Sequence, residues 1–365
     1  MNCEIEFLPV GEGAKSGDAI VLRYWDADLN DWRVMVVDGG YAATGKAICD
    51  HIRRYYETEI IDHLVSTHPD NDHMSGLRTV MEEMDVRQLW MNVPEAHAAD
   101  ILPLFKSRRW QVENLRRELR KSYDYVTTLL QLAEAQGTTI YLPFQGQQIG
   151  PFTVLSPSRE MYEGLLPQFR DTPPPDIELL TQLGTWLRGI GRRVAQATRM
   201  VIPEDWATET LKDGGVTSAE NESSVVLYGR LGHGGVFLTA DAGLRALYEA
   251  SRFADESGID ISDGLWIFQV PHHGSRNNIS PSALNYFLGG PVSPGASRRT
   301  QCVVSAGVSD PTHPRKVVVN ALLRRGCSVT TTKQTALRFW YGLPQRPGLT
   351  SVQSLTFSDH VEAYD

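Results

Sequence analysis

Four side chains that commonly bind metal ions lie within "HPDNDH": His68, Asp70, Asp72 and His73. The segment follows the apolar run "IDHLVST", which predicts a strand, so we expect a loop at a strand end. On an extended loop, side chains two residues apart point the same way and adjacent ones diverge, so the segment could face two neighbouring metal ions. These nitrogen and oxygen ligands suit zinc, manganese or iron, whereas the absence of sulfur argues against a purely structural zinc. A polar loop with ordinary turn hydrogen bonds is the weaker alternative.

The elements that must position this loop predict an α/β protein. Short runs rich in β-branched and aromatic residues predict strands in "EIEFLPV", "DAIVLRYW" and "WRVMVVDGG", and "ATGKAICDHIRRYYET" has helical spacing. Strands follow in "TTIYLPF" and "FTVLSP". Six more strand-like runs occur between 223 and 342, with helices near 243–257, 280–288 and 314–325.

Two segments depart from this alternation. Residues from about 95 to 136 have helical periodicity and almost no glycine. Residues 158–220 give weak signals and contain the chain-breaking "DTPPPD". We expect both to be insertions in a single domain that spans residues 1–365.

The ordered motifs carry a resemblance to a known family. "HPDNDH" is similar to the H-x-H-x-D-H signature of the metallo-β-lactamase fold, with Asp70 in place of the middle histidine. Together with "FLPVGEG…GDAIVL", "VVDGG", "NESSVVL", "FLTAD" and "VPHHGS", it resembles the hydrolase domain of ComEC-type competence proteins and their stand-alone relatives. The resemblance runs from Glu6 to about Phe339 and implies a four-layer αββα sandwich, whose site lies where strand-end loops of both sheets meet.

The resemblance implies a centre of two divalent ions, zinc or manganese, with magnesium as an alternative. His68 and Asp70 would ligate the first ion, and Asp72 and His73 the second. Asp241 of "LTAD" would bridge both ions, although an aspartate there could instead cap the following helix. A water between the ions would have a lowered pKa and attack an electrophile, so the implied reaction is hydrolysis.

Other family positions complete the site. In "PHHG", His273 would ligate and His272 would face the substrate as proton donor or phosphate contact, although the sequence does not separate the two. Asp38 of "VVDGG" would orient the metal loop, or would merely start a turn. Asn221 stands where related proteins supply another histidine, so the first site would be oxygen-rich and a single-metal protein stays open. His233 is expected on the surface of a hairpin turn.

The late segment "SDPTHPRK" is similar to the G-H-P element of the family. The resemblance implies that His313 contacts phosphate together with Arg315 and Lys316. The alternative is a polar residue at a helix start.

Charge limits the partners. The chain carries 35 basic and 44 acidic residues, a net charge of −9, so any contact with nucleic acid must be local. From Pro103 to Lys121 there are seven basic residues against two acidic ones, and Arg108, Arg109 and Trp110 lie among them. Such a helix could guide a nucleic-acid backbone, with Trp110 available for stacking, or be a solvated face. A second patch comprises Arg188, Arg192, Arg193 and Arg199.

Three functions remain open. The first is a metal-dependent phosphodiesterase acting on DNA or RNA, for which the stand-alone architecture suggests an effector role, with a protein partner, in a larger bacterial system such as phage defence. The second is a hydrolase of a small phosphoester, lactone or thioester, and the third is a non-catalytic metal-stabilised module of a protein complex. The sequence predicts a cytoplasmic location, because it has neither an apolar span nor a signal core. We also expect no disulfide among Cys3, Cys49, Cys302 and Cys327.

Overall fold

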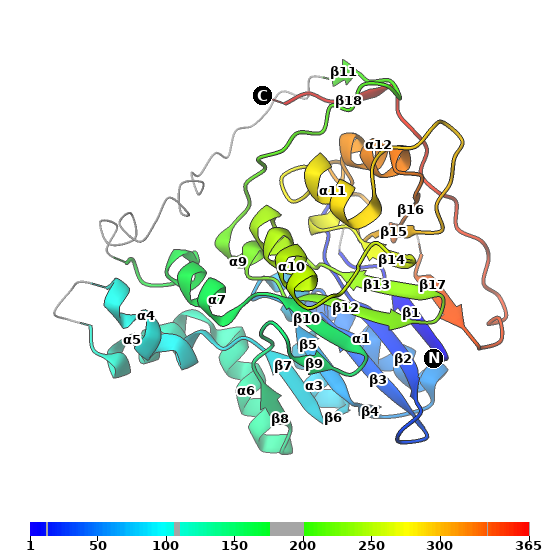
Figure 1. The fold of residues 1–365 in the computed structure, drawn as a ribbon. Helices are drawn as coiled ribbons and strands as arrows, with labels where there is room; N and C mark the ends of the chain where they lie inside the picture. Colours follow the sequence, from blue (N-terminus) through cyan, green and yellow to red (C-terminus); the bar gives the residue numbers. More distant parts are fainter. Residues whose placement is uncertain (12–13, 106–109, 176–200, 334, 365) are drawn as a thin grey trace.

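Two seven-stranded sheets organise the protein in the computed structural model, which describes residues 1–11, 14–105, 110–175, 201–333 and 335–364 (Figure 1). The first sheet has the order β17-β1-β2-β3-β5-β7-β8. Its strands are β1 (Cys3–Phe7), β2 (Ile20–Asp26), β3 (Asp31–Val37), β5 (His63–Ser66), β7 (Gln88–Met91), β8 (Thr139–Tyr141) and β17 (Leu337–Tyr341). The last strand of the predicted series, β17, pairs antiparallel with β1, so the second half of the chain completes the first sheet.

The second sheet has the order β16-β15-β14-β13-β12-β10-β9. Its strands are β9 (Gln148–Ile149), β10 (Phe152–Ser156), β12 (Val226–Leu231), β13 (Gly234–Leu238), β14 (Leu265–Gln269), β15 (Gln301–Val304) and β16 (Ser328–Thr331). Two small ladders join β4 (Ile60–Ile61) to β6 (Asp85–Val86), and β11 (Val201–Pro203) to β18 (His360–Glu362).

The alternation of side chains along β1 explains how the sheets pack. Cys3, Ile5 and Phe7 lie in the core between the sheets, together with residues of β10, β12, β13 and β14. Glu4 and Glu6 point to the opposite face and are also buried. Because an unpaired buried carboxylate is costly, arginines accompany both glutamates. These are Arg23, Arg338 and Arg346.

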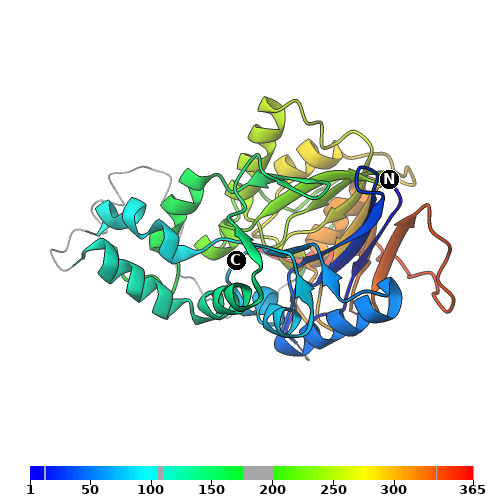
Figure 2. The ribbon, with the colours of Figure 1, turned by 90° about the horizontal axis from the view of Figure 1, so that it is seen from below.

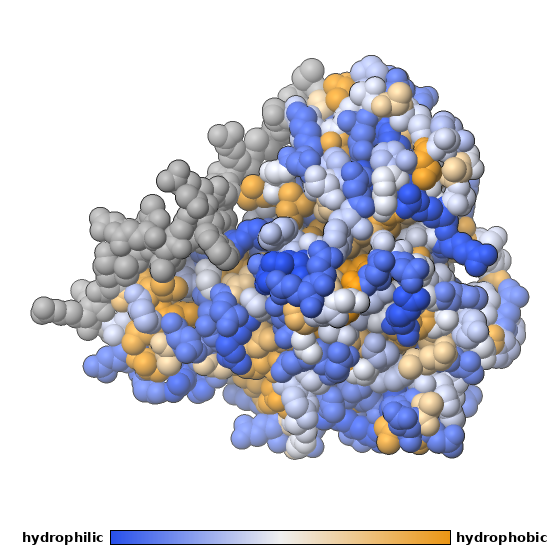
Figure 3. Space-filling view, in the orientation of Figure 1, coloured by the Kyte–Doolittle hydropathy of each residue, from blue (hydrophilic) through white to orange (hydrophobic). Residues whose placement is uncertain are grey.

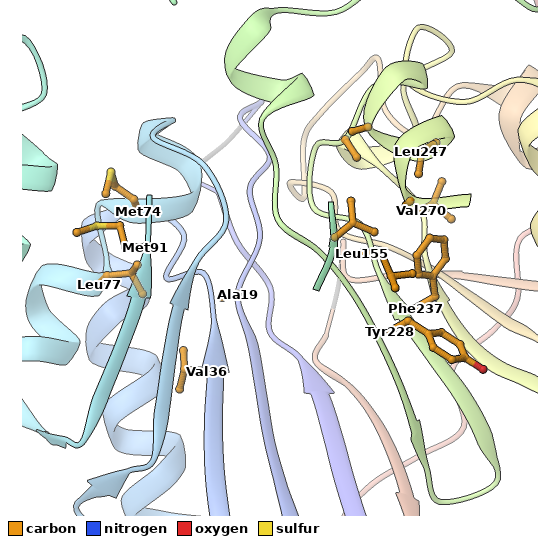
Figure 4. Packing of buried hydrophobic residues seen from close by; sticks show 14 of the residues in the cluster. Ala19, Val36, Met74, Leu77, Met91, Leu155, Tyr228, Phe237, Leu247 and Val270 are labelled. Carbon is orange, nitrogen blue, oxygen red and sulfur yellow. The ribbon is translucent and has the colours of Figure 1, made fainter. Parts of the chain in front are cut away.

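Helices cover the outer face of each sheet. The helices beside the first sheet are α1 (Ala42–His51), the π-helix η1 (Ile52–Tyr56), α3 (Leu77–Glu83) and α6 (Asp124–Gln136). Those beside the second sheet are α10 (Leu244–Glu256), α11 (Pro281–Leu288) and α12 (Lys316–Arg324). Figure 2 shows the sheets between the blue α1 and the yellow-green α10. Figure 4 shows the packing, with Leu77 near Met91 on one side and Phe237 near Val270 on the other. The predicted αββα sandwich is confirmed.

The first of the two segments expected to be insertions is helical, as predicted, but it is made of short pieces. These are η2 (Pro94–His97), α4 (Ala98–Ile101), η3 (Leu102–Leu104) and α5 (Val112–Ser122), followed by α6. In Figure 1, α4 and α5 lie to one side of the sandwich, beyond α7 (Arg159–Leu165). The second segment contributes α7, η4 (Leu166–Gln168), β11 and α9 (Ala219–Glu222). Arg108 and Arg109, and all four arginines of the predicted second patch, lie outside the described residues.

The face in Figure 3 is largely hydrophilic, with hydrophobic residues in scattered patches.

Three further expectations concern membrane spans, thiols and His233. No helix in the described ranges has the length and apolar character needed to cross a membrane. All four cysteines are buried and free, and exposed His233 lies in the β12–β13 turn, as predicted.

Candidate metal centre

The candidate site lies at the carboxyl ends of strands from both sheets. Asp38 follows β3, the "HPDNDH" segment follows β5, Asp241 follows β13, and the histidine pair follows β14. The pairs β3–β5 and β13–β14 are parallel, so their carboxyl ends meet at the same edge of each sheet. Loops at this edge commonly form the binding site of an open α/β sheet.

The metal loop is not extended, so the predicted side-chain alternation is wrong. Residues Asn71–Met74 form one helical turn, α2, because the backbone N–H groups of His73 and Met74 donate to the carbonyl of Asp70. On this turn His73 swings back toward His68, and their ring centroids lie 4.2 Å apart. The loop thus directs its two histidines into one group.

Asp241 is the centre of that group. Its Oδ1 lies 3.3 Å from Nε2 of His73, and its Oδ2 lies 3.9 Å from Nε2 of His68. Nε2 of His272 is 3.6 Å from Asp241 Oδ2, and Nε2 of His273 is 3.9 Å from Asp241 Oδ1. The Asp241 carboxylate therefore has histidine nitrogens on several sides.

The donor atoms that face inward have no hydrogen-bond partner in the described part of the chain. They are Nε2 of His68, His73 and His273, together with Oδ1 of Asp241, and all four are buried. Each unsatisfied buried polar atom costs about 1–3 kcal/mol. Ligand atoms lie within 4.8 Å of one another in the overlapping groups of His68, His73 and Asp241 and of Asp241, His272 and His273, so divalent cations would satisfy these atoms and the donor set fits metal ions. Asp72 stands at the rim, where its Oδ2 lies 3.6 Å from Nε2 of His273.

The other ring nitrogens fix the orientation of these histidines. Nδ1 of His73 lies 2.7 Å from Asp38 Oδ2, and Nδ1 of His273 lies 2.9 Å from the carbonyl oxygen of Ser305. Asp38 in turn accepts hydrogen bonds from the backbone N–H and hydroxyl of Thr67, at 2.9 and 2.7 Å. Such partners orient metal ligands and raise their basicity.

Strained turns aim the same side chains. Asp38, His272 and His273 have positive φ angles of 59°, 46° and 57°, which L-residues other than glycine rarely adopt. Backbone strain of this kind costs of order 1–3 kcal/mol per residue and clusters at functional sites. Here it lies at strand ends whose side chains enter the centre.

The two adjacent histidines differ in exposure. The side chain of His273 is 4% exposed, whereas that of His272 is 30% exposed. Asn221 does not enter the ligand group; its Nδ2 lies 3.0 Å from Nδ1 of His272. Asn278 Oδ1 lies 2.9 Å from the same nitrogen. The amides therefore hold His272 at the accessible side of Asp241.

Mutual electrostatics determines the charges in the centre. Burial disfavours ionisation of Asp241, but the surrounding histidines hold its pKa well below the ordinary value. Burial of Asp72 is likewise outweighed by the attraction of the His273 ring, whose Nε2 lies 3.6 Å away, so the pKa of Asp72 falls to about 2. Burial lowers the pKa of His273, but the carboxylates of Asp241 and Asp72 outweigh it and raise this pKa to about 9. Both carboxylates are therefore ionised, and a cation must displace protons from His73 and His273 to bind.

Asp18 belongs to the site although it was not among the predicted residues. It is 2% exposed, its Oδ1 is buried without a hydrogen-bond partner, and its Oδ2 lies 3.9 Å from Nδ1 of His73. Gly17 allows this approach, because a Cβ there would lie 2.4 Å from the backbone oxygen of Asp72. The sequence feature that could have indicated Asp18 is the Gly-Asp pair directly before the strand "AIVL".

His313 lies beside the histidine pair. Its ring stacks on that of His272 with centroids 6.1 Å apart, and its Nδ1 lies 3.0 Å from Asp310 Oδ2. Asp310 is held in turn by the hydroxyl of Ser16, at 2.7 Å. The predicted phosphate contact is thus positioned next to the accessible histidine.

Two predicted residues lie away from the ligand group. Asp70 pairs with Arg170, which also donates to Glu220, so the Asp70 carboxylate is engaged outside the centre. Trp110 is half-buried and packs edge-to-face on Phe105.

The predicted basic helix α5 is partly neutralised, because two of its four basic residues are paired. Arg116 pairs with Glu113, and Arg120 donates twice to Glu95. Paired and exposed charges of this kind resemble the solvated face that was the alternative reading.

Comparison with known proteins gives a distant likeness. No family model matches the sequence, and no curated protein matches it. Among solved structures, the chain is similar to the crystal structure of a protein assigned as a metallo-beta-lactamase from Thermotoga maritima. The identity is 10% and the TM-score 0.34, over 71% of this chain and 94% of that chain.

Proposed function

We propose that the protein is a metal-dependent hydrolase that cleaves phosphodiester bonds in nucleic acid. The observation that carries this proposal is the set of buried, unpartnered histidine nitrogens around the Asp241 carboxylate. An apolar or hydrogen-bonded core would not leave such atoms facing one another, because each loses its hydration without compensation.

The chain's own residues divide the work. Divalent ions held by His68, His73, Asp241 and His273 would supply Lewis acidity and lower the pKa of an attacking water. Asp38 and Ser305 keep the ligating rings in place from behind. This division leaves the substrate side to less buried groups.

The accessible rim suits a charged phosphodiester. Asp72 and His272 are 25% and 30% exposed, so they form the opening of the centre. His272 there can donate a hydrogen bond to a phosphate oxygen, and stacked His313 can reach the same side. Arg170 is 60% exposed at the Asp70 end of the loop, where it pairs with Asp70 and Glu220. Hydrogen-bond donors around an accessible opening favour an anionic substrate over a neutral lactone or thioester.

The test uses full-length protein stripped of metal and resupplied with Mn²⁺, Zn²⁺ or Mg²⁺. Supercoiled plasmid, linear duplex, single-stranded DNA and RNA are incubated with it, beside an Asp72→Ala/His73→Ala variant. Cleavage by the parent with at least one metal, and none by the variant, is the expected result. Intact nucleic acid with every metal, from protein that elemental analysis shows to be loaded, would contradict the proposal.

A further inference from the structure

We infer that a cleft beside the metal centre binds the sugar–phosphate backbone of a single nucleic-acid strand. The cleft has a volume of about 1040 Å³ and is formed by the segment after η4, the loop before α9, and the residues that follow the histidine pair. This inference rests on the proposed function, and it adds the path that the strand follows away from the cleaved bond.

The cleft adjoins the metal centre through two direct contacts. Arg170 lines the cleft and pairs with Asp70 of the metal loop. Beside Arg170, α9 carries Asn221, which contacts His272. Gly215 holds the loop before α9 close to the residues that follow the histidine pair, because a Cβ there would lie 2.4 Å from the backbone oxygen of Asn277. A strand that leaves the centre on the His272 side would therefore enter a preformed cleft.

Two cations in this cleft, whose lining also includes Asp213 and Glu220, are arranged around an aromatic ring. Lys212 Nζ lies 4.7 Å from the ring centroid of Tyr364, and Arg276 Cζ lies 4.3 Å from it. The hydroxyl of Tyr364 accepts from the backbone N–H of Lys212, and Arg276 donates to the carbonyl of Ala363. Tyr364 belongs to the segment after β18, and Figure 1 shows β18 beside β11. The chain thus holds both cations close together.

Neither Lys212 nor Arg276 has an ion-pair partner among the residues that the structure describes. The contrast with other exposed arginines is clear, since Arg252 contacts both Glu249 and Glu256, and Arg230 lies 3.5 Å from Asp263. Cations that keep free donors in a concave site are suited to phosphate oxygens. Lys212 and Arg276 lie over the Tyr364 ring. We therefore expect the two cations to contact the phosphates of the strand, and we do not expect the tyrosine ring to stack on a base.

Size favours a polymer over a small ester. Pockets for small molecules typically measure about 300–1,000 Å³. The cleft reaches the upper end of that range without counting the metal centre itself. Its cations lie on a chain of net charge −9, so the attraction is local, as a guided strand requires.

The test measures binding alone, with metal-stripped full-length protein in excess chelator so that no cleavage occurs. Fluorescence anisotropy follows a labelled DNA strand of about 12 nucleotides as the NaCl concentration is varied. The test variant is Lys212→Gln/Arg276→Gln, and Arg230→Gln/Arg252→Gln removes the same charge elsewhere. A third variant, Lys212→Arg/Arg276→Lys, keeps the charges. Circular dichroism checks that each variant is folded.

We expect the test variant to bind about tenfold more weakly, and its slope of log K against log salt to shrink by about 1.4, since each lost phosphate contact on a single strand removes about 0.7. The charge-keeping variant and the distant control should bind like the parent. Equal binding by both Gln variants, no binding by the parent, or tighter binding of a duplex would overturn the inference. Binding that depends on Lys212 and Arg276, without cleavage under any metal, would overturn the proposed activity and leave the cleft assignment standing.

Discussion

Two groups of metal-capable side chains occur in the described residues, and they differ in how their donors are used. One surrounds Asp241 at the strand ends, and the other comprises His97, Asp100 and Glu163 in the helical insertions. In the first, ligand atoms from several strand ends face one another without hydrogen-bond partners. In the second, Nδ1 of His97 lies 2.9 Å from Glu163 Oε1, so one nitrogen of the histidine is already engaged by the carboxylate of the same group.

Other neighbours widen the difference. Arg159 lies 3.7 Å from the Glu163 carboxylate and supplies a resident positive charge. Asp100 is exposed, whereas Asp241 is 2% exposed. The His97 ring packs against Phe144 and Tyr162, and its other nitrogen is buried without a partner there. Proximity of histidine and carboxylate is therefore not sufficient for a metal centre, which also needs converging, unsatisfied donors held from behind.

The sharpest way to break this comparison is Asp241→Asn. The amide keeps the shape but removes the central charge, so we expect bound metal to fall and the hydrolysis rate to drop by about 10³-fold or more. Elemental analysis and initial rates with the best metal measure both. Asp50→Asn, an exposed residue paired with Lys46, serves as the control. Full metal content in the Asn variant would remove Asp241 from the ligand set.

Removal of the metal with a chelator should distinguish the two groups by the change in melting temperature. Metal removal should lower the melting temperature of the parent by several degrees, because a ligand present at 100 times its dissociation constant stabilises by about 2.7 kcal/mol. Differential scanning calorimetry with and without chelator should give the same shift in His97→Gln and no shift in Asp241→Asn. An abolished shift in His97→Gln would mean that the insertion cluster binds the ion.

The comparison also shows how far the sequence could be read. The strands, the outer helices and the αββα class follow from local periodicity, since each strand alternates between the inter-sheet core and the helix layer. His68, His73, Asp241 and His273 converge because strand-end positions are fixed by that topology.

Long-range contacts account for what was not predicted. Arg170 engages Asp70 from 100 residues away, and no local pattern indicates such a pair. The helical turn of the metal loop depends on which backbone groups the Asp70 carbonyl meets, and Asp18 enters from a separate loop. Likewise, Tyr364 meets Lys212 and Arg276 only through the docked chain end.

Asp18 allows a finer test of whether residues behind the candidate ligands contribute to metal affinity. Asp18→Asn keeps the volume but removes the charge near His73, so we expect metal affinity to fall about tenfold, the lower limit for residues that orient metal ligands. Competition with a metal-sensitive dye measures the affinity, and melting of the metal-free protein checks the fold. Unchanged affinity would limit Asp18 to packing.

The smallest expected effect belongs to the insertion cluster. In His97→Gln/Glu163→Gln, the hydrogen bond between η2 and α7 is weakened, which should cost about 1–2 kcal/mol in the free energy of unfolding. Metal content and hydrolysis rate should stay within twofold of the parent, because the cluster is separate from the Asp241 group. Urea unfolding and elemental analysis of the same samples measure the two quantities. The opposite result would be a loss of bound metal with no change in the free energy of unfolding. It would mean that His97 and Glu163 bind the metal although they are hydrogen-bonded to each other, and the contrast between the two groups would fail.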